Sequence, residues 1–552
     1  MSGGARPERA AAPPPIHRGL LLALMGAPWL LLWPLPLLMA RGVLGQPTAL
    51  LTDRGGEAVR HLWSWWAAAR EGAPLRLHSD LLNAPHGVEV HVVDPLHGAL
   101  YLLGAAVGGP AVGWGLVCGL GVGLAGLAGL LLAREAGSAG PGQAVGAAAG
   151  LACATVLASV VDGISEGLGV GWVGLQLAAL LSLRRGLGPG RLAGLAGCIA
   201  AATYTGAYNA VWVAFIDVPV GIWLLRRTRA HLGAGAVGVA LSVPYLLAAL
   251  GQSAARPGGG GWRAAPSPPD PAASPWRGAW MEGADALDLL VPGALTGVAD
   301  WATTAYLGPV LVFAATAGLW RERRLWPWAV GAAAFAALAL GPFLVVGGQV
   351  LGSVTPARLL ESLPGLDRLS RWYRAGAVAV LLLAPVAARA VRRPGPALAL
   401  AALLLVDGRL LGPIPTGLPL TPLPQGTVLQ GVAGPIAEQP PSFPLRQPGV
   451  PADLNLLLQI SHGHPTSGTI DAVAGAATTG PGMLGLQRAL ALPVGEAGRG
   501  AAAEAAGALS RAGYRSVAVY VDAVRGGGEG NLAAALGPPI AEDALLRVYA
   551  LP

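Results

Sequence analysis

The sequence predicts an all-α polytopic membrane domain of about eleven spans, followed by a small extracytoplasmic α/β domain. The first observation is composition: of 552 residues, 53% are hydrophobic and 12% are charged, and the mean hydropathy is +0.56. A soluble chain carries roughly 25% charged residues, so a soluble enzyme is excluded. The second observation is that many apolar runs approach the roughly 20 residues that a spanning helix needs. The third is a change of pattern after residue 412, where apolar runs give way to proline-rich sequence.

The apolar runs before residue 412 are the candidate spanning helices. In chain order they are 20–40, 108–133, 143–160, 168–183, 192–206, 207–224, 232–252, 304–320, 326–346, 374–391 and 396–412. The first run follows basic residues, but it exceeds the roughly 7–15 residues of a cleavable signal peptide's apolar region. We therefore interpret it as a retained span. The stretch 96–133 has room for an interfacial helix before its span.

The distribution of arginine is an independent indicator of topology, because cytoplasmic loops are enriched in Arg and Lys. If the N-terminus is cytoplasmic, every second connection between spans is cytoplasmic. The arginines in these cytoplasmic connections are Arg134; Arg184, Arg185 and Arg191; Arg226, Arg227 and Arg229; Arg321, Arg323 and Arg324; and Arg389, Arg392 and Arg393. The short opposite connections near 161–167 and 205–208 hold no Arg. This topology places four segments outside the cytoplasm: 41–95, 253–303, 347–373 and 413–552.

The chain divides into two predicted domains. Residues 1–412 form the transmembrane domain, and residues 413–552 form a proline-rich linker and the extracytoplasmic α/β domain. In the second domain, Ala501–Ala512 is Ala-rich with polar breaks, as in a helix, whereas Ser516–Asp522 and Leu545–Leu551 are predicted strands. We expect a multi-pass protein of the bacterial inner membrane.

Charge and cysteine content exclude other classes of protein. The net charge is +7 and all 36 basic residues are Arg. The arginines interrupt apolar runs and form no stripe interleaved with aromatic residues, so no nucleic-acid partner is expected. Cys118, Cys153 and Cys198 lie in apolar segments and provide neither a disulfide framework nor a metal-binding knuckle.

The first outer loop contains the candidate catalytic and metal-binding groups. Asp53 and Asp80 are candidate catalytic carboxylates, because a carboxylate within hydrogen-bond reach can take the proton of an attacking hydroxyl. His91 and Asp94 lie three residues apart and are candidate ligands of a divalent metal such as Mg²⁺ or Mn²⁺. Pro95 interrupts the helix that would align them on one face. The alternative is that all of these are solvated loop residues.

A group of arginines at the outer face runs against the expected charge distribution. Arg358, Arg368, Arg371 and Arg374 lie in or directly after segment 347–373. The guanidinium group binds phosphate bidentately, and a lipid phosphate lies at this depth. We take the first three as candidate ligands of a phosphate-containing substrate. The alternative is that they anchor the protein to phospholipid headgroups.

Aromatic and acidic residues near the membrane have both a functional and a structural interpretation. Trp63 and Trp66 are candidate substrate contacts, although tryptophans at this depth commonly form a belt at the membrane surface. Asp217 lies within an apolar run, where a charge is costly. It is therefore protonated, paired or directed into an internal cavity.

Several short motifs together resemble a known family of membrane enzymes. In the first outer loop these are Asp53, His61-Leu62-Trp63-Ser64-Trp65-Trp66, Glu71-Gly72-Ala73-Pro74 and Leu82-Asn83-Ala84-Pro85-His86-Gly87. Later motifs are Tyr306-Leu307-Gly308, Leu338-Ala339-Leu340-Gly341-Pro342, Leu363-Pro364-Gly365-Leu366-Asp367-Arg368 and Ile460-Ser461-His462-Gly463-His464-Pro465. The pattern resembles the GT-C-type glycosyltransferases. The resemblance implies a polytopic enzyme that uses a polyprenyl-phosphate sugar, with an acidic residue of the first outer loop as its catalytic group and often a divalent metal. The chain departs from that pattern in having Asp53 alone, without an adjacent acidic residue.

These inferences predict a glycosyltransferase that moves a sugar from a polyprenyl-phosphate-linked donor to a glycan, lipid or protein acceptor on the extracytoplasmic face. One alternative is a transporter or lipid flippase, which usually has polar residues or broken helices at mid-membrane in matched halves. Asp217 is nearly alone in that respect, and the sequence has no visible half-repeat. Another alternative is a non-catalytic protein of the same fold in cell-envelope assembly.

Overall fold

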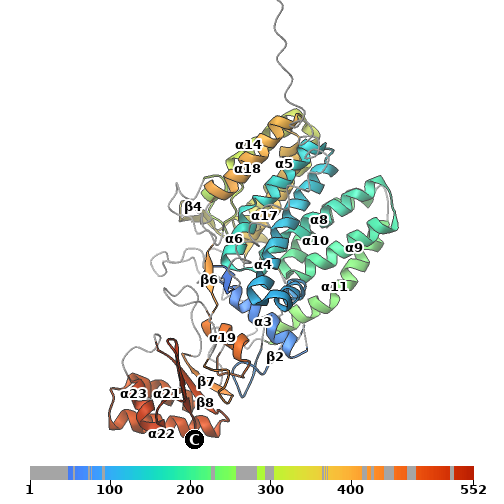
Figure 1. Cartoon of the computed structure of the whole chain (residues 1–552). Helices are drawn as coiled ribbons and strands as arrows, with labels where there is room; N and C mark the ends of the chain where they lie inside the picture. The colour runs from blue at the N-terminus through green and yellow to red at the C-terminus, as the bar shows by residue number, and fades with distance from the viewer. Residues whose placement is uncertain are drawn as a thin grey trace, which may run out of the picture.

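The structure is a computed structural model of the whole chain. It describes residues 48–53, 56–72, 75, 78–89, 94–225, 230–255, 283–291, 304–363, 366, 369, 371–412, 419–423, 428–440, 453–468, 480–521 and 528–552. A helical bundle occupies one end of the molecule, and a small sheet with three helices occupies the other (Figure 1). Helices α3 (Ala58–Arg70) and α19 (Leu454–His462) lie between them.

The bundle consists of helices from the chain before residue 412. They are α4 (Pro95–Glu135), α5 (Gly140–Leu151), α6 (Ala154–Asp162), α7 (Ser165–Leu168), α8 (Val170–Ser182), α9 (Pro189–Tyr204), α10 (Ala207–Leu225), α11 (Ala230–Ala255), α14 (Pro309–Arg321), α15 (Trp326–Ala339), α16 (Pro356–Leu360), α17 (Ala375–Ala388) and α18 (Pro394–Val406). Every predicted span from 108–133 onward contains helix. The predicted span 20–40 lies outside the described residues.

Five helical segments of the described chain are long and apolar enough to cross a membrane. They are Pro95–Glu135, Gly140–Asp162, Ser165–Arg185, His231–Ala248 and Pro394–Leu411, and shorter apolar helices are Ala207–Trp223, Pro309–Arg321 and Trp372–Ala388. Such lengths match the roughly 30 Å of bilayer hydrocarbon. The chain is therefore an integral membrane protein, and the count of about eleven spans stays a prediction.

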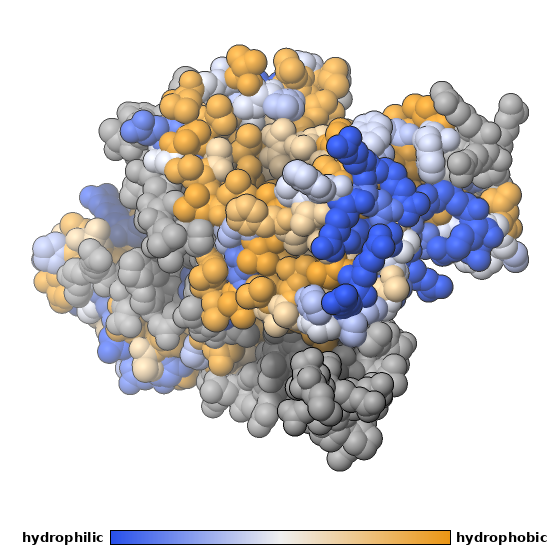
Figure 2. Space-filling model, turned by 90° about the horizontal axis from the view of Figure 1, so that it is seen from above, coloured by the Kyte–Doolittle hydropathy of each residue, from blue (hydrophilic) through white to orange (hydrophobic). Residues whose placement is uncertain are grey.

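The described arginines of the predicted cytoplasmic connections gather at one end of the bundle, and Arg226, Arg227 and Arg229 lie outside the described residues. Arg185 pairs with Glu135 at 2.6 Å, and Arg389 pairs with Glu322 at 2.5 Å. Both pairs join the ends of neighbouring helices. We call this end, where α4, α8, α14 and α17 terminate, the Arg-rich end. Figure 2 is turned by 90° from the view of Figure 1, so that the molecule is seen from above. It shows hydrophilic residues gathered among hydrophobic ones.

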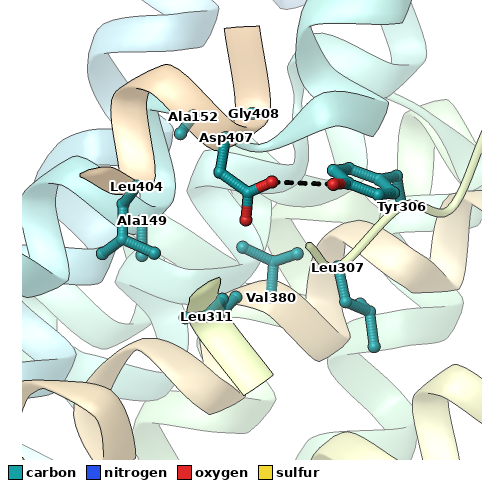
Figure 3. A pocket seen from close by; sticks show the side chains of 9 residues that line it. All are labelled: Ala149, Ala152, Tyr306, Leu307, Leu311, Val380, Leu404, Asp407 and Gly408. Atoms are coloured by element: carbon teal, nitrogen blue, oxygen red, sulfur yellow. Dashed lines mark hydrogen bonds between the residues drawn. The ribbon is translucent and has the colours of Figure 1, made fainter. Parts of the chain in front are cut away.

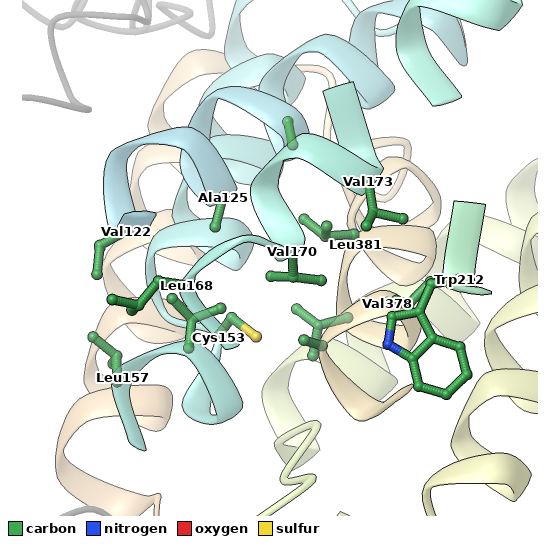
Figure 4. Packing of buried hydrophobic residues seen from close by; sticks show 14 of the residues in the cluster. Val122, Ala125, Cys153, Leu157, Leu168, Val170, Val173, Trp212, Val378 and Leu381 are labelled. Carbon is green, nitrogen blue, oxygen red and sulfur yellow. The ribbon is translucent and has the colours of Figure 1, made fainter. Parts of the chain in front are cut away.

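Small residues let the central helices approach closely. A Cβ atom on Gly129 of α4 would lie 2.1 Å from the carbonyl oxygen of Gly146 on α5, and the reverse substitution would place a Cβ 2.4 Å from the Gly129 oxygen. Close packing of this kind holds helices together in lipid, where the hydrophobic effect does not. Side chains from α4, α6, α8, α10 and α17 fill the remaining space (Figure 4).

Asp217 of α10 has a partner within the bundle. The side-chain amide of Gln176 on α8 donates a hydrogen bond to its carboxyl group, and Gln176 itself is fully buried. Hydrogen bonds between membrane helices each contribute about 0.6 kcal/mol on average. The contact gives Asp217 a structural role between α8 and α10.

The C-terminal part contains a mixed four-stranded sheet and three helices. The strand order is β7 (Ile436–Gln439), β8 (Ser516–Tyr520), β10 (Leu546–Ala550) and β9 (Ala541–Glu542), with β7 and β8 parallel and the other pairs antiparallel. Helices α21 (Pro481–Ala491), α22 (Glu496–Arg511) and α23 (Glu529–Leu536) pack on this sheet through an apolar cluster. The segments that the sequence assigns to one helix and two strands are α22, β8 and β10.

The first outer loop connects this part to the bundle. Strand β1 (Ala49–Leu51) pairs with β6 (Leu420–Pro422), and the loop's short hairpin is β2 (His78–Ser79) with β3 (Val88–Glu89). Arg60 of α3 pairs with Asp453 at 2.5 Å. The Trp63 indole N–H donates to Gln459 of α19 at 2.6 Å. These contacts fix α3 between the two parts of the molecule.

Glu438 of β7 makes the stability of this part depend on pH. It is fully buried, and neutral groups surround it: the Tyr520 hydroxyl donates to it at 2.9 Å, with Asn455 and Thr466 close by. Burial raises the pKa of Glu438 from 4.5 to about 7. Between these values the unfolded chain loses the proton while the folded chain keeps it, so stability falls as pH rises through that window.

We expect the loss to total about 3 kcal/mol between pH 4.5 and 7, from about 1.4 kcal/mol for each pKa unit. Glu438→Gln should remove this pH dependence, because the amide stays neutral and still accepts from Tyr520. The measurement is the unfolding midpoint of the whole protein in detergent at several pH values. Glu542→Gln, on an exposed β9 residue, is the control. Identical pH profiles for Glu438→Gln and the unmodified protein would show that Glu438 does not titrate in this range.

Candidate functional site

Three side chains from separate segments meet near the end of the bundle opposite the Arg-rich end. His61 of α3, Asp94 directly before α4, and Glu166 of α7 each offer a ligand atom, and these atoms lie within 4.8 Å of one another. The His61 Nε2 atom is 4.0 Å from Glu166 Oε2. His97 of α4 lies beside them, with Nδ1 3.7 Å from Asp94 Oδ2. We call His61, Asp94 and Glu166 the acidic cluster.

Local backbone geometry brings these segments together. Gly163 ends α6 with φ +77°, and a Cβ atom there would lie 2.4 Å from the Ala58 nitrogen at the start of α3. The close approach that only glycine permits places α7 beside α3. Gly206, with φ +144°, packs against Glu166 and Asp94 from the turn before α10, where a Cβ would lie 3.1 Å from Glu166 Cβ. The cluster is therefore bounded by α3, α7 and this turn.

Ser165 connects two members of the cluster. Its hydroxyl donates to Asp94 Oδ2 and lies 2.9 Å from His61 Nδ1. The tautomer with the proton on Nδ1 donates to the serine oxygen and leaves the Nε2 lone pair on the side that faces Glu166. Metal-binding histidines are commonly oriented by such a second hydrogen bond.

The side chains of the acidic cluster are of types that could hold a divalent cation. Two ligands of one cation, each about 2.1 Å from it, lie at most about 4.2 Å apart. His61 Nε2 and Glu166 Oε2 meet this limit at 4.0 Å, and all three ligand atoms lie within 4.8 Å of one another. Glu166 Oε2 is buried and accepts no hydrogen bond from the described residues. Burial, together with the negative charge of the neighbouring Glu166, raises the pKa of Asp94 well above its usual range. A bound cation would favour the ionised carboxylate, so cation binding should strengthen as pH rises.

Arg374 completes the site from the turn before α17. The guanidinium Nη2 atom is 3.6 Å from Glu166 Oε2, and the group lies 4.7 Å from the centre of the Tyr208 ring. Arg374 is 6% exposed, yet its Nε and Nη1 atoms have no hydrogen-bond acceptor among the described residues. Arg371 is near enough to act on the charge of Glu166. Buried N–H groups of this kind are normally satisfied, so they mark a place for an anionic ligand.

The predicted catalytic residues lie at different distances from this cluster in the fold. Asp53 is half-buried, and its backbone N–H donates to Val161 at the end of α6, so it borders the segment that carries Glu166. Asp80 is at the surface, with its side chain 70% exposed and 3.2 Å from His78 Nε2.

The predicted metal ligands and substrate-binding residues also lie in different parts of the structure. Asp94 is part of the cluster, whereas His91 and Arg368 lie outside the described residues. Arg358 pairs with Glu361 at 3.3 Å. Trp63 has no exposed surface, and Trp66 is half-buried with the Arg70 guanidinium 5.4 Å from its ring.

Sequence reasoning missed His61, Glu166, Ser165 and Arg374 as site residues. Glu166 and Ser165 lie in the connection 161–167, whose lack of Arg indicates its side of the membrane. The usable signal was Asp162 and Glu166 in a short loop between two apolar runs, since isolated acids near a membrane core are functional candidates. Arg374 belongs to the predicted arginine group but was not selected from it.

A second buried acid, Asp407, has a structural explanation. It begins a π-helical turn, Asp407–Leu411, at the end of α18. The Tyr306 hydroxyl donates to Oδ1 at 2.7 Å (Figure 3). The Val310 N–H donates to Oδ2 at 3.0 Å. Apolar side chains line most of the surrounding pocket. Both oxygens are satisfied, so Asp407 caps the start of α14 and ties it to α18.

The similarity of this chain to known proteins is found among solved structures. No protein-family model matches the chain, and no curated protein matches it. Among solved structures, two of the arabinofuranosyltransferase AftD from Mycobacteria are similar to it, with TM-scores of 0.46 and 0.47 and identities of 18% and 19%. Each match covers 97% of this chain and 41% of the AftD chain. The present chain thus corresponds to less than half of that protein's length.

Proposed function

We propose that the protein is a membrane glycosyltransferase that transfers a sugar from a polyprenyl-phosphate-linked donor to an acceptor on the extracytoplasmic face. The observation that carries the proposal is the acidic cluster beside the buried guanidinium of Arg374. Glycosyl transfer needs a carboxylate for the acceptor proton and positive charge for the departing phosphate. The sequence resemblance to GT-C-type enzymes supports the same reaction class.

In the proposed reaction, the acceptor hydroxyl oxygen attacks the anomeric carbon of the donor. A new C–O bond forms, the bond between that carbon and the phosphate oxygen breaks, and the polyprenyl phosphate leaves with the bonding electrons. Asp94 takes the acceptor proton, and Ser165 holds Asp94 in place. The free N–H groups of Arg374 bind the phosphate. A divalent cation held by His61, Asp94 and Glu166 would neutralise negative charge on the leaving group.

The other sequence candidates remain part of the proposal. Asp53 borders the cluster through its backbone and is the second candidate for the catalytic carboxylate, ahead of exposed Asp80. Arg371, Arg358 and Arg368 are proposed to guide the anionic donor toward Arg374. We also propose a bacterial inner-membrane location, with residues 413–552 outside the cytoplasm and a glycan, lipid or protein as acceptor.

The test is sugar transfer by the purified protein in lipid nanodiscs, with a panel of polyprenyl-phosphate pentoses and hexoses as donors. We expect turnover of at least one donor, stimulation by Mn²⁺ or Mg²⁺, and inhibition by a chelator. Asp53→Asn should lower the rate more than Asp80→Asn, because Asp80 is mostly exposed. If every donor remained intact with an acceptor extract present, the non-catalytic alternative would replace this proposal.

A further inference from the structure

Helix α4 consists of two parts that do not share one axis. Gly108 (φ −147°, ψ 19°) and Gly109 (φ 84°, ψ 179°) are not helical and separate residues 95–107 from residues 110–135. A Cβ atom on Gly104 would lie 2.8 Å from the Gly113 Cα, and one on Gly113 would lie 2.5 Å from the Tyr101 carbonyl oxygen. The first part therefore folds back against the start of the second. We call residues 95–107 the leading helix.

The leading helix carries its polar side chains on the buried side. His97 and Tyr101 are each 2% exposed. The Tyr101 ring lies 5.4 Å from the Trp65 ring of α3, and a Cβ atom on Gly98 would lie 2.7 Å from Trp65. The residue before the helix is Asp94, so this buried side faces α3 and the acidic cluster.

The opposite side of the leading helix is exposed and entirely apolar. Leu103 is 65% exposed, Val107 is 88% exposed and Leu102 is 36% exposed, and Ala99 and Ala106 are exposed beside them. These positions follow the three- and four-residue spacing of one helix face. No residue from 95 to 107 is Asp, Glu, Arg or Lys. The usual arrangement of a water-facing helix is thus reversed, with polar groups inside and apolar groups outside.

We propose that this stripe of five residues, Ala99, Leu102, Leu103, Ala106 and Val107, lies in the lipid hydrocarbon at the membrane surface opposite the Arg-rich end. Lipid is the occupant that fits, because the helix passes through a two-residue break into the apolar span 110–135 and contacts the start of that span. A surface without hydrogen-bond donors, acceptors or charge loses no polar interaction when hydrocarbon covers it.

The proposal fixes the depth of the acidic cluster. Asp94 and His97 lie at the start of the leading helix, so a helix embedded in lipid holds these two groups at the bilayer boundary. A ligand with an apolar tail and a polar head could then reach the cluster without leaving the membrane. The inference concerns the helix itself and does not depend on the transferase activity.

The test is spin-label accessibility in the full-length protein reconstituted in liposomes. Nitroxide labels are attached to Leu103→Cys and Val107→Cys in a background with Cys118→Ala, Cys153→Ala and Cys198→Ala. Relaxation is measured with oxygen, which concentrates in lipid, and with a water-soluble nickel chelate. Leu241→Cys on α11 provides the lipid reference and Ala503→Cys on α22 the water reference, since both positions are exposed.

We expect the labels at 103 and 107 to relax more with oxygen than with the nickel chelate, as at Leu241. Greater relaxation by the nickel chelate, as at Ala503, would overturn the proposal by placing the stripe in water. Protection from both reagents would also overturn it, because the stripe would then face protein. If a labelled variant does not fold, Ala106→Cys on the same face replaces it.

Discussion

Asp94→Asn should abolish most cation binding and lower the rate of sugar transfer by about 10²–10⁴-fold, the usual contribution of a positioned acid–base group. The amide keeps the shape of the carboxyl group and still accepts from the Ser165 hydroxyl, so the packing is unchanged. It lacks the negative charge that binds a cation and accepts a proton. The measurements are titration calorimetry with Mn²⁺ and initial rates in nanodiscs.

The same variant should fold at least as stably as the unmodified protein. Burial and the neighbouring Glu166 raise the pKa of Asp94, which means that its ionised form is disfavoured in the folded state. Neutral asparagine removes that penalty. Asp80→Asn is the matched control, because it makes the same chemical change at an exposed position. An Asp94→Asn protein with normal cation affinity and normal rate would remove Asp94 from the site and leave Asp53 as the leading candidate.

The helices of the bundle could be predicted because their signal is local. In lipid, the backbone N–H and C=O groups of a long apolar run have no water to bond to. A helix satisfies them by hydrogen bonds within the same segment. The predicted spans from 108–133 onward therefore coincide with helix. The break at Gly108 and Gly109 is also local, since two adjacent glycines tolerate the backbone angles that end a helix.

The acidic cluster could not be predicted because it depends on packing between distant segments. Asp94 was recognisable by its type and by its place before an apolar run. His61 and Glu166 join it only because α3 packs on α4 and because Gly163 brings α7 against the start of α3. Sequence spacing pointed instead to His91, the nearest candidate along the chain. Spacing identifies partners on one helix turn, not partners on three separate segments.

The arginines of the predicted phosphate-binding group also differ in a way that depends on packing. All four arginines are alike in sequence, but Arg358 lies one helical turn before Glu361 and pairs with it. Arg374 follows the buried residues Trp372 and Tyr373 in the turn that opens α17, which places its side chain inside the protein. Arg374 is buried for this reason, whereas Arg358 and Arg371 are partly exposed.

Arg374→Gln should destabilise the folded protein by roughly 3–5 kcal/mol, the usual effect of removing one partner of a buried ion pair. Arg374 is 6% exposed, and its nearest carboxylate is Glu166 at 3.6 Å. Without the guanidinium, that carboxylate keeps its burial but loses its main opposing charge. The measurement is the free energy of unfolding by denaturant titration in mixed micelles, at a pH where carboxylates are ionised.

A double-mutant cycle separates this effect from lost packing over Tyr208. Glu166→Gln in the Arg374→Gln background removes the unpaired charge, so the double variant should recover part of the lost stability. Arg185→Gln is the matched control: Arg185 also pairs with a glutamate, Glu135, at 2.6 Å, but it is 46% exposed. An exposed pair contributes about 0–1 kcal/mol. Equal losses for Arg374→Gln and Arg185→Gln would mean that Arg374 is solvated and that the N–H groups assigned to the phosphate are already satisfied by water.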